Sequence, residues 1–272
     1  MDKYPSQLLL SSKHHKELIL APIFEAHGHE ILVNKSFDTD AFGTFCGSTP
    51  RPEGPQITIK EKCLAGMAFA GKRQGLASEG SFGPHPHYPF LSSNEEWLIF
   101  IDLDQHLEIY GRSTTLEVCH AQLHYRDAAQ LTPFLSSCSF GKQGLVFKDC
   151  RTNKIIEKGI LSEDKLYELM ANIPEWLIET DLRAHMNPTR QKNIAAAGRD
   201  LLKRMYSFCP KCSAPDFVVK ELEGKLPCAQ CQKATESHLF ELAICTNCNY
   251  QSQHRRKDKK EEDPQFCQHC NP

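Results

Sequence analysis

The C-terminal quarter of the chain contains four CxxC pairs: Cys209-Pro-Lys-Cys212, Cys228-Ala-Gln-Cys231, Cys245-Thr-Asn-Cys248 and Cys267-Gln-His-Cys270. A CxxC turn can direct two sulfurs at one ion, and two such turns complete the tetrahedral four-thiolate site that Zn²⁺ prefers. Gaps of 15, 13 and 18 residues separate successive pairs, and zinc sites use such spacings. Eight cysteines therefore predict two structural Zn²⁺ sites, which leave no coordination position open for catalysis.

The order in which the four pairs combine is left open by their spacing. Sequential pairing would give two zinc ribbons. Interleaved pairing, first with third and second with fourth, would give a cross-braced module. A single CxxC could also be a redox pair, a disulfide or part of an iron centre, but four together favour zinc.

Cysteine usage and charge divide the chain into three parts. Eight of the 13 cysteines lie in the four pairs. Residues 182–206 carry six basic residues and one acidic residue, whereas residues 209–272 carry nine of each. The net charge of −2 therefore leaves −7 for residues 1–181. We expect an α/β catalytic or ligand-binding domain over 1–181, a basic connecting helix over 182–208 and a zinc-binding module over 209–272.

The overall composition is that of a globular protein. The chain has 272 residues, with 40% hydrophobic and 24% charged residues, and its mean hydropathy is −0.46. No apolar run approaches the roughly 18 residues of a membrane span, and no signal peptide is recognisable. We therefore expect a cytoplasmic protein with no membrane partner, whose cysteines are free thiols or metal ligands.

Apolar patterning predicts a mixed-sheet α/β fold for residues 1–181. Early strands alternate with helices, and several strands then follow one another. The strands are expected at 7–12, 30–33, 75–78, 97–103, 107–110, 116–123 and 144–147, and the helices at 16–26, 56–69, 128–135 and 163–172. A fold of this class with an amphipathic helix and a double zinc-ribbon-like module is the architecture we expect.

The first candidate anion site lies where the first strand meets the first helix. Ser12, His14 and Lys16 fall at this junction. A lysine in the first helical turn opposes the helix dipole, so it is a candidate for facing an anion, with Ser12 and backbone amides as further phosphate ligands. A capped helix with a surface lysine explains the same pattern.

The second candidate site follows the strand predicted at 75–78. Glu79 comes directly after this apolar segment, and Gly80, Ser81 and Gly83 follow in a predicted turn. Open α/β sheets place ligands at the carboxyl ends of strands, and glycine amides can approach a phosphate closely. A tight loop with a solvated glutamate is the alternative.

The third candidate site precedes and begins the basic helix. Asn187 is expected to cap this helix, with Pro188 as its first residue. The residues of this third site could hold a phosphate, or could form a structural salt-bridge network: Asp181, Arg183, His185 and Arg190. The predicted buried stripe of the helix is Ile194, Ala197, Leu201 and Met205.

Four strings across the chain resemble an uncharacterised bacterial family of unknown function: DTDAFGTF (38–45), LASEGSFGPHP (76–86), ETDLRAHMNPTR (179–190) and DPQFCQHCNP (263–272). The order of elements from Ser12 to Glu79 is also similar to nucleoside triphosphate pyrophosphatases of the inosine triphosphatase and Maf type. That resemblance implies that Ser12 and Lys16 bind phosphate. It also implies that Glu79 holds Mg²⁺ or orients the attacking water.

These patterns predict a metal-dependent hydrolase of a nucleotide or related phosphate compound. Glu79, Lys16 and Asp181 are its candidate catalytic residues, and Asp38 or Asp40 could replace Asp181 as metal ligand or base. Arg183 and Arg190 would neutralise phosphate charge. The alternative is a non-catalytic zinc protein that docks a protein or nucleic acid. A neutral zinc module does not favour nucleic acid, and the oligomeric state is not predicted.

Overall fold

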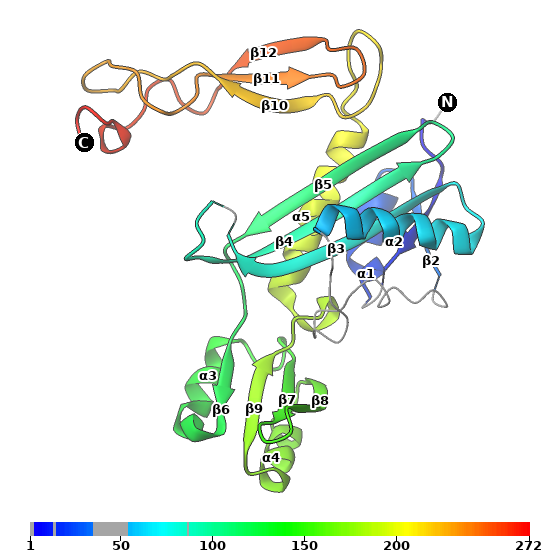
Figure 1. Cartoon of the computed structure of the whole chain (residues 1–272), viewed down its shortest axis with the longest axis vertical. Helices are drawn as coiled ribbons and strands as arrows, with labels where there is room; N and C mark the ends of the chain where they lie inside the picture. Colours follow the sequence, from blue (N-terminus) through cyan, green and yellow to red (C-terminus); the bar gives the residue numbers. More distant parts are fainter. Residues whose placement is uncertain (1–2, 13–14, 35–53, 86) are drawn as a thin grey trace. The chain divides into compact units, whose positions relative to one another are not determined.

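The computed structural model of the chain describes residues 3–12, 15–34, 54–85 and 87–272 (Figure 1). It contains two compact units, residues 1–201 and residues 202–272. Helix α5 (Pro188–Met205) contains the boundary between them. In the part of the chain that is described, no helix has the length and apolar character needed to cross a membrane.

A mixed five-stranded sheet forms the first half of unit 1, in the order β2-β1-β3-β4-β5. Strand β1 pairs in parallel with β2 and β3, whereas β3, β4 and β5 are antiparallel neighbours. The strands are β1 (Gln7–Ser11), β2 (Glu30–Val33), β3 (Gln74–Pro84), β4 (Ser92–Asp102) and β5 (Leu107–Thr115). This sheet confirms the mixed α/β class expected from the sequence.

Helices pack on both faces of this sheet (Figure 1). Helix α2 (Pro55–Ala70) buries Ile59, Cys63 and Met67 against odd-numbered sheet residues such as Leu9 and Ala77. Helices α1 (Glu17–Glu25) and α5 lie on the even-numbered face. There α5 approaches β5 so closely that a Cβ at Gly111 would lie 2.5 Å from the Leu201 Cβ. The stripe predicted for α5 is buried as expected: Ile194, Ala197, Leu201 and Met205.

A four-stranded antiparallel sheet forms the rest of unit 1, in the order β6-β9-β7-β8. Its strands are β6 (Gln122–His124), β7 (Leu145–Asp149), β8 (Lys154–Ile160) and β9 (Trp176–Thr180). Its core includes Phe147, Ile178 and Leu166. The helical segments of this part are η2 (Tyr125–Gln130), α3 (Leu131–Ser137), α4 (Glu163–Asn172) and η3 (Ala184–Met186).

Unit 2 contains one small antiparallel sheet, in the order β10-β11-β12. The strands are β10 (Val218–Glu223), β11 (Phe240–Ile244) and β12 (Gln251–Arg255), and the short helix η4 (Pro264–Phe266) precedes the last cysteine pair. Most side chains of β10 and β12 are exposed. An apolar core this small needs crosslinks in addition to hydrophobic packing to stabilise the fold of unit 2.

Two expectations about strands are wrong. The turn predicted from Glu79 is absent, because β3 continues to Pro84 and each residue of its outer half pairs with β4. The strand predicted over 116–123 shrinks to β6, the residues that pair with β9. The sequence patterning did not predict strands β8 and β9. Long-range pairing, which local patterning cannot report, decides all of these cases.

Candidate functional site

Each cysteine pair of unit 2 lies in a tight turn that directs two sulfurs to one side. In the first three turns, the residue after the second cysteine adopts a left-handed conformation: Ser213, Gln232 and Asn249, with φ between 56° and 59°. The backbone N–H of each donates to the carbonyl of the first cysteine of its pair. Further N–H groups, of Lys211 and Gln230, point at the sulfurs of Cys209 and Cys228.

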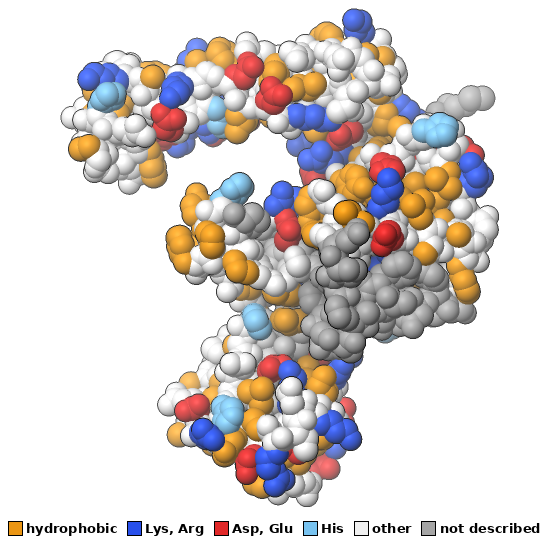
Figure 2. All heavy atoms as spheres, viewed as in Figure 1, with side chains coloured by type: hydrophobic (Ala, Val, Ile, Leu, Met, Phe, Trp, Pro, Cys, Tyr) orange, Lys and Arg blue, Asp and Glu red, His pale blue; other side chains and the backbone are white. Residues whose placement is uncertain are grey.

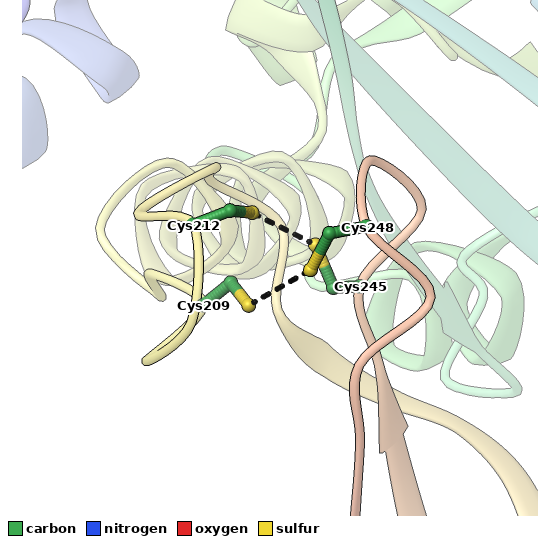
Figure 3. Close-up of side chains that lie close together, drawn as sticks. All are labelled: Cys209, Cys212, Cys245 and Cys248. Carbon is green, nitrogen blue, oxygen red and sulfur yellow. Dashed lines mark hydrogen bonds between the residues drawn. The ribbon is translucent and has the colours of Figure 1, made fainter.

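The eight sulfurs gather in two groups of four, and the grouping is interleaved. The first group is Cys209, Cys212, Cys245 and Cys248 (Figure 3). The second is Cys228, Cys231, Cys267 and Cys270. The structure therefore confirms two four-cysteine sites and selects the cross-braced arrangement over two sequential ribbons.

The sulfur–sulfur distances fit a tetrahedral metal site. The Sγ atoms of Cys209 and Cys248 are 3.7 Å apart, and those of Cys212 and Cys245 are 3.5 Å apart. In the second group, the Cys228–Cys270 and Cys231–Cys267 separations are 3.8 and 3.7 Å. A tetrahedron with metal–sulfur bonds of about 2.3 Å has edges of about 3.8 Å, whereas a disulfide would need about 2.05 Å.

Local hydrogen bonds favour a thiolate in each group. The amide of Asn247, 3.6 Å from the Cys212 sulfur, lowers the pKa of that thiol to about 6. The backbone N–H of His269 lowers the pKa of Cys267 to about 7. Because metals bind thiolates, both groups can hold a metal ion such as Zn²⁺.

A second candidate site lies in unit 1, at the carboxyl end of β1. The pairing of β1 with β3 ends where Ser11 meets Ala77. Among the described residues, the next stretch of β3, from Ser78 onward, pairs with β4 alone. Because successive side chains of a strand point to opposite faces, Ser78 faces α1 and α5, whereas Glu79 faces α2.

Lys16 and Arg190 form buried ion pairs with Glu96 on the face of the sheet that α1 and α5 cover. The Lys16 Nζ donates to the Ser78 hydroxyl at 2.6 Å and lies 3.4 Å from the Glu96 carboxylate. The Nε of Arg190 donates to Glu96 at 2.6 Å, and its Nη1 donates to the Leu182 carbonyl at 2.7 Å. No more than 5% of Lys16, Glu96 or Arg190 is exposed.

On the opposite face, Lys62 of α2 forms an ion pair with Glu79. Both residues are buried, with 6% and 4% of their surface exposed. Two lysines from two helices thus contact neighbouring β3 residues from opposite sides, directly beyond the end of β1. We call Lys16, Lys62, Glu79, Glu96 and Arg190 the charged cluster.

Asparagine side chains orient the charged cluster. Asn94 donates to the Glu96 carboxylate at 3.0 Å, and Asn193 of α5 donates to the Asn94 side-chain oxygen at 2.9 Å. Asn187 accepts from the Arg190 backbone N–H at 2.9 Å, which confirms it as the helix cap. Gly80 makes room for Glu96, because a Cβ there would lie 2.2 Å from a carboxylate oxygen.

Burial and charge act in opposite directions on the ionisable groups of the charged cluster. Burial lowers the pKa of Lys16 to about 8, although Glu96 opposes this shift. Burial also raises the pKa of Glu96, but Arg190 and Lys16 outweigh it, and the pKa lies below its ordinary value. Glu96 is therefore an anion at neutral pH.

The structure brings together part of the predicted anion site. Lys16, Glu79 and Arg190 lie in the charged cluster, and Ser12 is buried beside the end of β1. Gly80 makes room for a carboxylate, whereas it was expected to approach a phosphate. Ser81 lies within β3, where its carbonyl accepts from Asn94. His14, Asp38 and Asp40 lie outside the described residues.

Asp181 and Arg183 form an ion pair of their own. The Arg183 side chain donates to both oxygens of Asp181, at 3.0 and 2.6 Å. Asp181 is 1% exposed, and its carboxylate also accepts from the Arg183 backbone N–H. His185 lies in η3, directly after this pair, and its ring packs edge-on against that of His15 at 5.3 Å. These contacts of Asp181 with Arg183 are therefore structural.

Sequence reasoning missed two members of the charged cluster, Glu96 and Lys62. A signal for each was present. Glu96 lies on the same face of β4 as the buried residues Leu98 and Phe100. Lys62 follows Ile59 by three residues on the buried side of α2. A charged residue on the apolar face of a helix or strand needs a partner when it is buried. This requirement identifies both Glu96 and Lys62 as candidates.

Comparison with known proteins gives one match. Residues 62–272 match a family described as a domain of unknown function, DUF6671. The chain belongs to the DUF6671 family. The matched DUF6671 segment contains all eight cysteines of the metal sites, together with Lys62, Glu79, Glu96 and Arg190; Lys16 precedes it.

Beyond the DUF6671 match, no curated protein and no solved structure matches the chain. The likeness to inosine triphosphatase and Maf-type pyrophosphatases therefore has no support from these comparisons. Membership in DUF6671 assigns no activity, so the function of the chain is argued below from the charged cluster and the cysteine groups.

In the basic run of unit 2, residues 254–260, two of the five Lys and Arg side chains pair with acidic neighbours. Arg256 pairs with Asp258, and Lys259 pairs with Glu262. On the face shown in Figure 2, basic and acidic side chains are interspersed along both units. Nucleic-acid affinity depends on unneutralised clusters of positive charge, so the expectation that this module does not favour nucleic acid stays a prediction.

Proposed function

We propose that each four-cysteine group holds a structural Zn²⁺ ion. The tetrahedral sulfur separations and the N–H groups directed at the sulfurs support this assignment. Four thiolates fill the coordination sphere of zinc, which leaves no position for water or substrate. In this role the two ions would supplement the small apolar core of unit 2.

We further propose that unit 1 binds a phosphate compound at the charged cluster and hydrolyses it. One observation carries this proposal: Lys16 and Lys62 reach Ser78 and Glu79 from opposite sides of the sheet, where β1 ends. Carboxyl ends of strands are where open α/β sheets bind ligands. Converging lysines at such an edge suit the charge of a phosphate group.

The three cations of the charged cluster support an anionic ligand. Lys16, Lys62 and Arg190 carry three positive charges, and Glu79 and Glu96 carry two negative ones. Buried charge is costly unless it is compensated. A phosphate near Lys16 and Lys62 would place two cations where charge develops during phosphoryl transfer.

Mg²⁺ finds no preformed site among the described residues. Groups of three or more ligating side chains occur there only as the two cysteine groups. Glu79 is the carboxylate that the described residues place on β3 just beyond the end of β1, and it pairs with Lys62. Mg²⁺ would therefore have to bind together with the substrate phosphate, and we assign it no step; it enters the assay as a variable.

The test is a release assay for phosphate and pyrophosphate with a panel of nucleoside triphosphates, with Mg²⁺, Mn²⁺ or EDTA. Wild type is compared with Glu79→Gln and Lys62→Met. The matched control is Lys60→Met, which removes a half-exposed lysine of the same helix that pairs with Glu108. We expect kcat/KM to fall by about 10²-fold or more in the first two variants and to be unchanged in the control.

A flat panel from folded protein that holds two zinc ions would overturn the hydrolase proposal. Binding of the same nucleotides without turnover would overturn hydrolysis but keep the anion site. The non-catalytic alternative, a zinc protein that docks a protein or nucleic acid, would then become the leading hypothesis, with retention on RNA that falls steeply with salt as its nucleic-acid signature.

A further inference from the structure

Two cysteines of unit 1 line the wall of one cavity, outside the charged cluster. Cys119 belongs to the connection between β5 and β6, and Cys138 caps the end of helix α3. The cavity between these segments has a volume of about 380 Å³, and both cysteines are free thiols. They lie 19 positions apart in the chain. The fold of unit 1, and not a local CxxC turn, therefore brings them together.

The contacts of the two thiols place the cysteines side by side. The Cys119 thiol donates to the backbone carbonyl of Cys138 at 3.8 Å, and Cys119 packs on the hydrophobic core that contains Cys138. The Cys138 thiol donates to the Leu135 carbonyl at 3.6 Å. Burial raises the pKa of Cys138 to about 11, and the neighbouring Cys119 adds to this shift. The two sulfurs are therefore close enough to interact electrostatically.

Solvent reaches the two thiols to different extents. Cys119 is half-buried, whereas Cys138 is 3% exposed. A dissolved disulfide therefore meets Cys119 first, and Cys138 is the enclosed partner. Thiol–disulfide exchange needs one accessible sulfur that attacks and a second sulfur that resolves the mixed disulfide. Cys119 and Cys138 meet these two requirements.

Burial also affects which redox state of the two cysteines is favoured. It raises the pKa of Cys119 as well as that of Cys138, so neither thiolate is stabilised by its surroundings. A disulfide is strongly oxidising when its reduced form is stabilised as a thiolate. The opposite shift at Cys119 and Cys138 favours the disulfide, which can be buried without a charge.

We infer that Cys119 and Cys138 are a redox pair, which a small-molecule disulfide converts from two thiols to one disulfide bond. The Cys119 thiolate attacks one sulfur of the small disulfide, forms a mixed disulfide and releases a first small thiol. The Cys138 thiolate then attacks the Cys119 sulfur, forms the Cys119–Cys138 bond and releases a second small thiol. The protein loses two electrons and two protons, and the small disulfide gains them as it becomes two thiols. The inference does not rest on the proposed hydrolysis, because neither cysteine belongs to the charged cluster.

The bond would fix the connection between the two sheets of unit 1. Cys119 lies between β5 of the five-stranded sheet and β6 of the four-stranded sheet, and α3 packs in the core of the four-stranded part. A disulfide across 19 positions restricts the unfolded chain. The oxidised protein should therefore melt roughly 5 °C higher than the reduced protein.

The experiment treats the full-length, zinc-loaded protein with an excess of glutathione disulfide in mild alkali, where thiolates are more abundant. Acid quenching, alkylation of the remaining thiols and peptide mapping by mass spectrometry then locate each bond, while a chelating dye follows zinc release. We expect a Cys119–Cys138 cross-link in most molecules while both zinc ions are still bound. Dithiothreitol should remove the cross-link and return the melting temperature to that of the reduced protein.

Variants assign the role of each sulfur. Cys138→Ala should stop the reaction at the mixed disulfide, so glutathione should accumulate on Cys119. Cys119→Ser should leave Cys138 unmodified, because the accessible sulfur is gone. Cys150→Ser is the matched control: it removes another half-buried thiol of unit 1 and should leave the cross-link unchanged. If Cys138→Ala does not fold, the peptide map of wild type and the Cys119→Ser variant still test the pair.

Three results would overturn the inference. The first is folded wild type in which Cys119 and Cys138 are both still alkylated after the reaction has reached equilibrium. The second is a main product in which either cysteine is bonded to a different cysteine, or in which glutathione stays on Cys119 of wild type. The third is a cross-linked form that melts below the reduced protein, because such a bond would form only from a distorted unit 1.

Discussion

The Arg190 guanidinium on the first turn of α5 lies 2.6 Å from the Glu96 carboxylate on β4, and both side chains are almost fully buried. The contact joins residues 94 positions apart in the chain. It therefore forms only when α5 has docked on the sheet. A buried pair of this kind costs desolvation but specifies which surfaces meet.

Arg190→Met should destabilise unit 1 by about 3–5 kcal/mol, because it leaves Glu96 buried without its main partner. Urea unfolding followed by a probe in unit 1 measures this loss. The double variant with Glu96→Gln should recover much of the stability. A single variant as stable as wild type would show that the pair contributes nothing to the fold.

Acid should destabilise unit 1 through Glu96. The folded-state pKa of Glu96 is depressed below its ordinary value. The stability it contributes is therefore present above about pH 4.3, the unfolded pKa, and declines as the pH falls toward the folded value. Melting temperatures of wild type and Glu96→Gln, measured from about pH 7 to pH 3, should differ most at neutral pH and converge in acid. Parallel curves would contradict the shift.

Lys16 should make unit 1 more stable in mild alkali. Burial lowers its folded pKa to about 8 from 10.5, so the unfolded chain binds the extra proton between these values. Stability contributed by this group then rises with pH across that window. Relative to Lys16→Met, wild type should gain about 2 kcal/mol between about pH 7.5 and pH 9.5. Equal slopes for the two proteins would exclude the lowered pKa.

Cadmium substitution tests the interleaved grouping directly. The ¹¹³Cd spectrum of the loaded protein should show two resonances in the four-thiolate range. Cys209→Ser and Cys245→Ser should alter the same resonance, and Cys228→Ser and Cys267→Ser the other. A shared resonance for Cys209 and Cys228 would indicate sequential ribbons instead.

The two four-cysteine sites are the most predictable feature, because the ligand residues and their spacing are both visible locally in each CxxC turn. The grouping of the four CxxC pairs depends on the path of the strands between them. The spacing of the cysteines does not reveal that path. Helix α5 is also predictable from the sequence, because Asn187 caps it and apolar residues form a stripe along it. The local signals at Glu79 were misleading, because glycine and proline suggest a turn. Pairing with the long strand β4 overrides them, and Gly80 is needed there for clearance from Glu96.

The interleaved order of the cysteines links the fates of the two metal ions. The chain from Cys212 to Cys245 spans 33 positions and contains the second pair of cysteines, and the chain from Cys231 to Cys267 spans 36 and contains the third. With both groups loaded, each ion would close a loop that contains half of the other ion's ligands. Loss of one ion would open the loop that holds two ligands of the remaining ion. Those ligands would gain conformational freedom, so the entropic cost of keeping the remaining ion bound would rise. Unit 2 should consequently exchange its metals as a pair, with half-loaded molecules scarce during a titration.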